Sequence, residues 1–177
     1  ATYVIWTVGC QMNRADSERL AGTLESVGLR PARSADEADV VVVNSCSVRQ
    51  TAEERVLGKL GYLKGLRKKR TDLLVALTGC MVSPHDQDLR SRLPFVDLFL
   101  PPLEWGPLLR ELAARGMAAP PQAQSQEAAC GSGAACRIAP AEGEGWPTRW
   151  VPIIYGCDNF CTYCIVPYRR GRERSRP

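Results

Sequence analysis

Short apolar runs alternate along the chain with longer segments whose apolar residues recur at helical spacing. The predicted strands are 3–8, 40–43, 73–77 and 95–100. The predicted helices are 13–27, about 48–69, about 83–93 and 103–115. Fully apolar strands that alternate with helices are typical of a parallel sheet covered on both faces. The pattern therefore predicts a doubly wound α/β domain over residues 1–116.

The periodicity stops after this domain. Residues 117–148 are rich in Ala, Gly, Pro, Gln and Ser, which predicts a linker or a flexible insertion. A further strand is expected at 150–155, and the sequence reaches Pro177 before another strand and helix are complete. We therefore expect residues 149–177 to be the truncated beginning of a second domain.

Composition and charge fit an ordinary globular protein, with 45% hydrophobic and 24% charged residues. The net charge of +4 permits a nucleic-acid partner without demonstrating one. No apolar run approaches the roughly 18–20 residues that span a bilayer, and no signal peptide is visible. We therefore expect no membrane partner and a cytoplasmic location.

Three of the eight cysteines follow predicted parallel strands. Cys10, Cys46 and Cys80 each stand just past the end of one strand. Ligands of doubly wound sheets bind outside the carboxyl ends of the strands, so the three thiols should converge on one edge. Three separately buried free cysteines are the alternative, because free cysteine is among the most buried residue types.

A second set of cysteines has a tighter spacing. Cys157, Cys161 and Cys164 form a C-x3-C-x2-C loop directly after a predicted strand. Three thiolates can hold three irons of a cubane cluster and leave the fourth iron open to an exogenous ligand. Structural zinc is the alternative, but it wants four ligands, and no histidine lies near this loop.

The cysteines lie within longer motifs. They are Gly9-Cys10-Gln11-Met12-Asn13, Asp16-Ser17-Glu18, Asn44-Ser45-Cys46-Ser47-Val48-Arg49, Gly79-Cys80-Met81, the run from Gly156 to Tyr168, and Arg170-Gly171-Arg172-Glu173-Arg174-Ser175-Arg176. Together they resemble the methylthiotransferase family of the radical S-adenosylmethionine superfamily. The resemblance covers about 116 residues and the final 28, and leaves the linker unmatched.

The resemblance implies two 4Fe-4S clusters, one on Cys157, Cys161 and Cys164 and the other on Cys10, Cys46 and Cys80. It implies that residues 149–177 begin a radical SAM (β/α) barrel, that S-adenosylmethionine binds the open iron, and that the backbone of Tyr163 lies near its adenine. The implied reaction inserts a methylthio group at C2 of an N6-prenylated adenosine beside the anticodon of tRNA. It consumes two molecules of S-adenosylmethionine per turnover and needs a reducing electron donor.

Other functions remain open on the sequence alone. Sister enzymes methylthiolate an aspartate of a ribosomal protein or threonylcarbamoyl-adenosine in tRNA. A non-catalytic iron-sulfur carrier is the alternative from another class. Because the family's complete barrel and its RNA-binding domain are not contained in these 177 residues, we expect this chain alone to be inactive.

Several further residues invite a functional interpretation. One group of cations near the end of the second helix contacts either tRNA phosphates or only solvent: Lys64, Arg67, Lys68, Lys69 and Arg70. Another flanks the second cysteine loop and meets either RNA phosphates or a cofactor carboxylate: Arg169, Arg170, Arg172, Arg174 and Arg176. We expect His85 to cap a helix or lie at the surface, and Cys130 and Cys136 not to be ligands.

Overall fold

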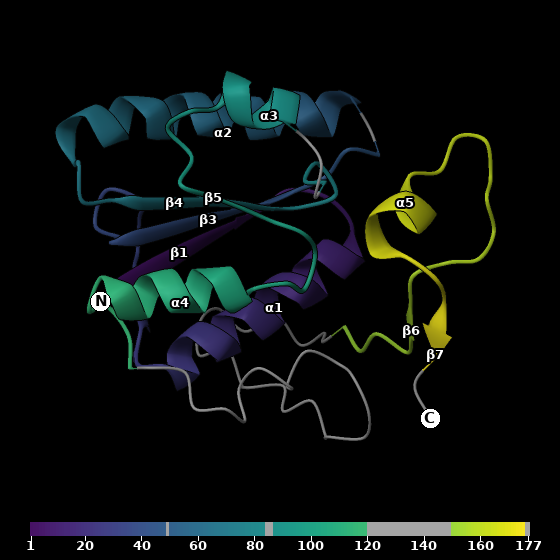
Figure 1. Cartoon of the computed structure of the whole chain (residues 1–177), viewed down its shortest axis with the longest axis horizontal. Coiled ribbons are helices and arrows are strands. Elements are labelled where there is room, and N and C mark those ends of the chain that lie inside the picture. Colours follow the sequence, from purple (N-terminus) through teal and green to yellow (C-terminus); the bar gives the residue numbers. More distant parts are fainter. Residues whose placement is uncertain (49, 84–86, 120–149, 176–177) are drawn as a thin grey trace.

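The computed structural model describes residues 1–48, 50–83, 87–119 and 150–175 (Figure 1). Its strands are β1 (Thr2–Thr7), β2 (Arg30–Pro31), β3 (Val40–Ser45), β4 (Leu74–Gly79), β5 (Leu98–Leu100), β6 (Ile154–Tyr155) and β7 (Arg174–Ser175). Its helices are α1 (Gln11–Ser26), α2 (Gln50–Lys69), α3 (Gln87–Arg92), α4 (Gly106–Ala114) and α5 (Val166–Arg170).

The first five strands form one parallel sheet in the order β2-β1-β3-β4-β5. The chain builds outward in opposite directions from β1 and β3, so the strand order reverses between these two neighbours. In open α/β sheets such a reversal leaves a crevice at the carboxyl ends of the strands, where ligands bind. The predicted doubly wound α/β domain is confirmed.

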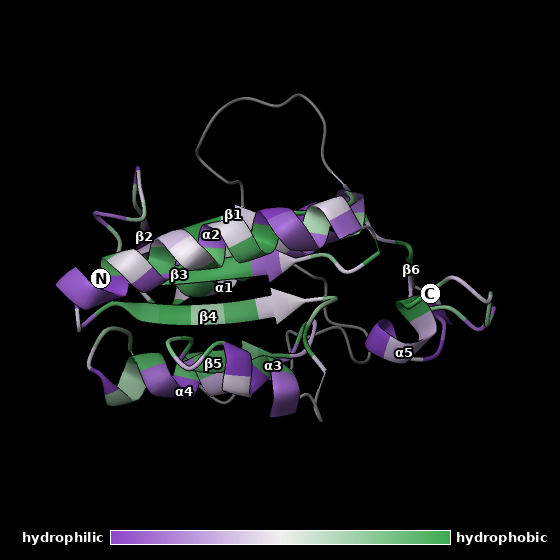
Figure 2. Ribbon diagram, turned by 90° about the horizontal axis from the view of Figure 1, so that it is seen from above, coloured by the Kyte–Doolittle hydropathy of each residue, from purple (hydrophilic) through white to green (hydrophobic). Residues whose placement is uncertain are grey.

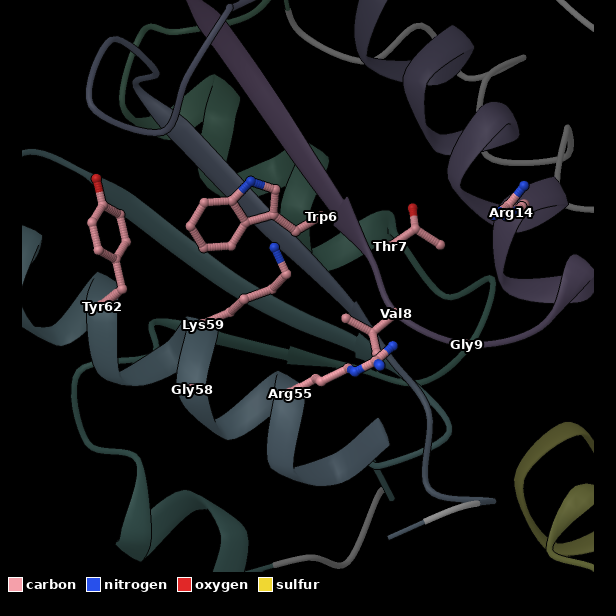
Figure 3. A pocket seen from close by; sticks show the side chains of 9 residues that line it. All are labelled: Trp6, Thr7, Val8, Gly9, Arg14, Arg55, Gly58, Lys59 and Tyr62. Carbon is pink, nitrogen blue, oxygen red and sulfur yellow. The ribbon is translucent and has the colours of Figure 1, made fainter. Parts of the chain in front are cut away.

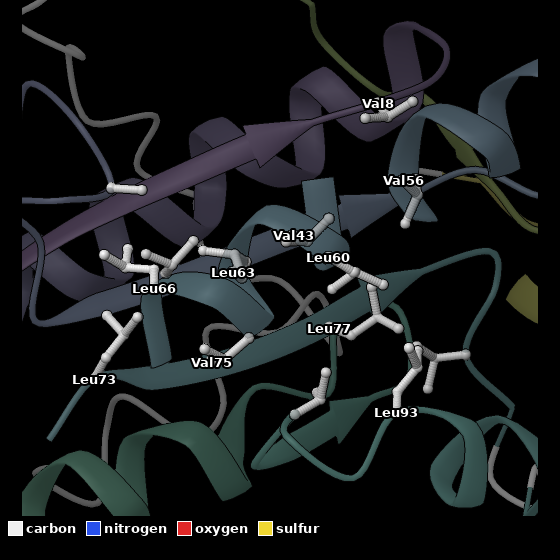
Figure 4. Packing of buried hydrophobic residues seen from close by; sticks show 14 of the residues in the cluster. Val8, Val43, Val56, Leu60, Leu63, Leu66, Leu73, Val75, Leu77 and Leu93 are labelled. Carbon is white, nitrogen blue, oxygen red and sulfur yellow. The ribbon is translucent and has the colours of Figure 1, made fainter. Parts of the chain in front are cut away.

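Helices cover both faces of the sheet, with α2 and α3 on one side and α1 and α4 on the other (Figure 1). Alternate residues of the central strands supply the two cores, as the two-residue period of a strand requires. Val41, Val43, Val75 and Leu77 pack against the leucines of α2 (Figure 4). Val40, Val42, Leu74 and Ala76 pack against leucines of α1 and α4. This two-sided burial explains why residues 40–43 of β3 and 74–77 of β4 are all apolar (Figure 2).

The edge elements differ from the sequence expectation. The short β2 was missed because its two exposed residues carry no apolar pattern, and only pairing with β1 defines it. The strand expected at 95–100 is limited to Leu98–Leu100. The strand expected at 150–155 is limited to Ile154–Tyr155, which pairs antiparallel with β7.

The segment 150–175 lies beyond the carboxyl ends of the strands (Figures 1 and 2). It contains the β6–β7 ribbon and the short helix α5, so the start of a barrel remains a prediction. None of the helices that the structure describes is long and apolar enough to cross a membrane.

Candidate metal centre

The loops after three neighbouring strands carry the first cysteine set. Cys10 follows β1 and directly precedes α1, Cys46 follows β3, and Cys80 follows β4. Since β1, β3 and β4 are adjacent, their carboxyl ends bring these loops together. The three loops therefore meet at one edge of the sheet, and Cys46 and Cys10 both raise the pKa of the Cys80 thiol.

Two glycines allow the cysteine loops to approach one another. Gly9 has φ of +137°, and a Cβ atom added there would lie 2.8 Å from the Cβ of Cys46. Gly79 has φ of +93°, and a Cβ atom there would run into the backbone carbonyl of Ser45. Only glycine therefore satisfies both the backbone conformation and the space between these loops.

Asn13 ties the first two loops together from the start of α1. Its buried side-chain amide donates to the carbonyl oxygens of Val8, at 3.0 Å, and Ser45, at 2.8 Å. The side chain of Asn44 donates to the backbone carbonyl of Asn13 at 2.8 Å and to the hydroxyl of Ser17 at 2.9 Å. Because each amide is buried and paired with main chain, the network fixes the relative position of the loops.

Cys80 is the most constrained thiol of this set, because it is buried and its backbone is held on both sides. Its N–H donates to Ser45 at 2.9 Å, and its carbonyl accepts from the hydroxyl of Ser47 at 2.9 Å. Burial raises the pKa of the Cys80 thiol, and the other two thiols raise it further, whereas the guanidinium of Arg170 lowers it. A metal ligand must be the thiolate, so Arg170 supplies the favourable charge at this position.

Arg170 reaches the cysteine edge from α5, and its side chain is only 1% exposed. Its guanidinium donates to the carboxylate of Asp16 at 2.7 Å, the side-chain oxygen of Asn13 at 3.2 Å and the hydroxyl of Tyr155 at 2.9 Å. The sequence suggested that this arginine meets an RNA phosphate or a cofactor carboxylate. In the structure Arg170 binds a protein carboxylate instead, because the N–H donors of its guanidinium are hydrogen-bonded within the fold.

The ion pair holds two charges away from water. Burial raises the pKa of the Asp16 carboxyl, and Arg170 opposes that shift. Burial disfavours the charged form of Arg170, but Asp16 and Tyr155 outweigh this and raise its pKa. Arg170 therefore stays charged beside the cysteine edge.

The loop with the second cysteine set is held by the chain that follows it. The N–H of Cys157 donates to the carbonyl of Gly171 at 3.2 Å, and the N–H of Asn159 donates to the sulfur of Cys157 at 3.4 Å. The N–H of Cys164 donates to the carbonyl of Cys161 at 3.0 Å, which closes a tight turn. The loop thus presents three free thiols at partly or fully exposed positions.

Tyr163 extends into solvent, with 88% of its surface exposed, so its side chain is not a core residue. Beside it, the ring of Phe160 makes an edge contact with Tyr168 at 5.8 Å between centroids. The role of the Tyr163 backbone stays a prediction.

The thiols of the two cysteine sets are ligands that suit soft metal centres. Each set offers three thiols, the ligand type of iron-sulfur clusters. Among the residues that the structure describes, no group of three or more His, Cys, Asp or Glu side chains is placed so that it could hold a metal ion. The surroundings of the first set favour a shared site, because Gly9 and Gly79 let its three loops lie close together.

The basic cluster of α2 separates into two kinds of residue. Arg67 pairs with Asp97 at 2.5 Å, and Arg70 donates to the carbonyl of Ala38 at 2.8 Å and to Asp39 at 3.3 Å. These two arginines anchor the helix end to the sheet, whereas Lys64, Lys68 and Lys69 are exposed.

The arginines that follow the second cysteine loop also differ among themselves. Arg172 lies 3.9 Å from Asp158 at the surface, and Arg174 lies over the Tyr155 ring. The expectations for His85, Cys130, Cys136 and Arg176 fall outside the residues that the structure describes.

A comparison with known families covers all five strands of the parallel sheet. Residues 2–101 match the family described as "Uncharacterized protein family UPF0004". The chain belongs to this family. The UPF0004 match includes Cys10, Cys46 and Cys80 together with the glycines and asparagines that position them.

Individual relatives of this UPF0004 member share a single name, tRNA-2-methylthio-N(6)-dimethylallyladenosine synthase. The proteins of Dictyoglomus thermophilum, Roseiflexus sp. and Herpetosiphon aurantiacus are 42%, 45% and 43% identical to it over 174, 177 and 177 residues. These alignments cover 98%, 99% and 99% of the chain, and 39%, 34% and 37% of the relatives.

The resemblance inferred from the cysteine motifs is therefore confirmed. The matches also extend through 117–148, which the motifs left unmatched. The chain spans little more than a third of the length of the curated relatives it matches.

Proposed function

We propose that the chain is part of a radical S-adenosylmethionine methylthiotransferase. The reaction inserts a methylthio group at C2 of an N6-prenylated adenosine beside the anticodon in tRNA. Two 4Fe-4S clusters, two molecules of S-adenosylmethionine per turnover and an external electron donor take part. The names of the relatives support the tRNA substrate.

Each cysteine set has its own task in this proposal. The thiolates of Cys157, Cys161 and Cys164 bind the cluster whose open iron receives S-adenosylmethionine. The thiolates of Cys10, Cys46 and Cys80 bind the cluster from which sulfur is delivered. When bound, the cluster on Cys157, Cys161 and Cys164 would supply, with S-adenosylmethionine, a radical that removes hydrogen from an unactivated ring carbon, which no side-chain base can do.

The residues around the first set position the thiols for this task. Gly9 and Gly79 let the loops meet, and Asn13 fixes their spacing through two buried hydrogen bonds. Arg170 brings a positive charge beside Cys80 and stabilises its thiolate form. It also connects this edge to the segment that carries the other cysteine set.

The observation that carries the proposal is the convergence of three thiols at the strand-order reversal of a sheet. Cys10 and Cys46 follow the two strands between which the order reverses, and Cys80 follows the next strand. Isolated buried cysteines have no need to gather at the one edge where such sheets bind ligands.

The test uses the full-length protein, anaerobically reconstituted and supplied with a reductant, S-adenosylmethionine and tRNA that carries the prenylated adenosine. Mass spectrometry of the digested nucleosides should detect the 2-methylthio product. Cys157→Ala should abolish both cleavage of S-adenosylmethionine and product. Cys46→Ala should retain cleavage and lose the methylthio product.

Other outcomes identify the competing functions. Product only on threonylcarbamoyl-adenosine, or only on a ribosomal-protein aspartate, would assign the chain to a sister activity. Intact clusters without any cleavage of S-adenosylmethionine would favour an iron-sulfur carrier.

A further inference from the structure

A cavity of about 700 Å³ lies between β1 and α2, and the cysteine chemistry does not account for it (Figure 3). Trp6 and Thr7 of β1 and the following Val8 line one side, and residues of α2 line the other. Its volume falls within the roughly 300–1,000 Å³ typical of ligand pockets. Gly9 also lines it, so the cavity opens directly beside Cys10 and the candidate metal centre.

The charge of the cavity has one sign. Arg55 and Lys59 reach it from α2, and Arg14 reaches it from α1 (Figure 3). None of the described residues that line it is acidic. The ammonium of Lys59 lies 4.2 Å from the centre of the Trp6 ring, which holds this cation at the cavity wall. Cations that line a cavity with no acidic side chain among its described lining residues create a field that favours a polyanion.

An aromatic ring stands beside these cations. Tyr62 is about half exposed and lies 5.8 Å from Trp6 between ring centroids. Its hydroxyl donates to the carboxylate of Asp36 at 2.6 Å, so the ring is fixed before any ligand arrives. A fixed, exposed ring next to cations is the arrangement by which proteins bind single-stranded nucleic acid, with phosphates on the cations and a base on the ring.

We propose that this cavity binds a single-stranded RNA segment next to the nucleotide that is modified, with Lys59 and Arg55 on a phosphate and Tyr62 under a base. The inference rests on the proposed function for the identity of the RNA. S-adenosylmethionine is a poorer occupant, because its sulfonium and ammonium outweigh its one carboxylate and the cavity repels net positive charge. An acidic peptide satisfies the cations but leaves the ring of Tyr62 without a flat partner.

The test measures binding of a synthetic anticodon stem-loop RNA to the full-length protein by fluorescence anisotropy over a range of salt concentrations. Lys59→Gln should reduce the slope of log affinity against log salt by about 0.7, the value for one lost contact to single-stranded phosphate. Arg110→Gln is the control, because it removes one positive charge from an exposed position on α4, on the opposite face of the sheet from α2. This control should leave the slope unchanged.

The aromatic contact has its own matched pair. Tyr62→Leu should weaken binding by about fivefold or more, the lower limit for losing one stacked base, and leave the salt slope unchanged. Tyr62→Phe keeps the ring and should bind within twofold of the unaltered protein. Tyr62 lies at the surface of α2, so circular dichroism melts should show that both Tyr62 variants fold.

Several results would overturn the inference. Equal salt slopes for Lys59→Gln and the unaltered protein would rule out the phosphate contact. Equal losses for Lys59→Gln and Arg110→Gln would show diffuse attraction rather than a site. Unchanged affinity of Tyr62→Leu would favour an acidic partner. The proposed function can fail independently of this inference. It fails if the unaltered protein binds RNA in this way but forms no methylthio product.

Discussion

The guanidinium of Arg170 donates to the carboxylate of Asp16 at 2.7 Å, although 154 residues separate them. Their side chains are 1% and 7% exposed, so the pair is buried between α5 and α1. The pair joins the segment behind the second cysteine loop to the helix that starts at Cys10. It is therefore a physical link between the two cysteine sets.

Breaking this pair should destabilise the protein strongly. A buried charge that loses its partner typically costs about 3–5 kcal/mol, so Arg170→Met should lower the free energy of unfolding in urea by about that amount. Arg92→Gln is the control, because Arg92 pairs with Asp88 at the surface at 3.8 Å and such pairs contribute about 0–1 kcal/mol. Similar losses in the two variants would contradict a structural role for the buried pair.

Gly79 should tolerate no side chain. Alanine at Gly28 meets nothing within 4 Å, so Gly28→Ala tests the cost of its φ of +93° alone, about 1–2 kcal/mol. Gly79→Ala has the same φ and also collides with the backbone of Ser45, so its loss of unfolding free energy should be clearly larger. Iron content should fall with it, because the loops of Cys46 and Cys80 are forced apart. Equal losses at the two glycines would contradict the close approach.

Truncating a leucine of α2 should destabilise the protein most where the side chain faces the sheet. Leu60 is fully buried among the valines and leucines of β3 and β4, so Leu60→Ala should cost about 2–5 kcal/mol. Leu57 lies on the same helix but is 39% exposed, and Leu57→Ala should cost less than half as much. Chemical denaturation of both variants measures the difference. A larger loss at Leu57 would contradict the assigned helix face.

Acid should weaken the fold partly through Asp39. Burial raises the pKa of this carboxyl, but hydrogen bonds from Thr2, the closer at 2.8 Å, and the charge of Arg70 outweigh it and hold the pKa below its ordinary value of 3.8. A carboxyl with a lowered folded-state pKa stabilises the fold above its ordinary pKa, and this contribution is lost as pH falls through the folded-state value. The stability difference between the unaltered protein and Asp39→Asn should therefore be largest above about pH 4 and shrink below it. A difference that does not change with pH would rule out this contribution.

The sequence predicted the central elements because local pattern and tertiary burial agree there. Val40 to Val43 is apolar on every residue, which only a strand buried on both faces requires. The position of Cys10, Cys46 and Cys80 followed directly, since the ends of parallel strands share one edge of the sheet.

The sequence could not predict the contacts that depend on docking between distant segments. Arg170 stands in an arginine-rich run that looks like a solvated or RNA-binding surface, and nothing local marks it as the arginine that is buried among those the structure describes. Asp16 gave a weak indication, because a carboxylate on the inner side of α1 needs a partner. The short strands β2 and β7 were not predicted for the same reason, since pairing rather than composition defines them.

The central claim is that Cys10, Cys46 and Cys80 bind one cluster and Cys157, Cys161 and Cys164 bind another. The most direct measurement is iron and acid-labile sulfide per chain after anaerobic reconstitution of the full-length protein, compared with its Cys10/Cys46/Cys80→Ala triple variant. Two cubane clusters predict roughly eight irons in the unaltered protein and about four in the variant. About four irons in both proteins would contradict a cluster at the sheet edge and leave only the one on the second cysteine loop.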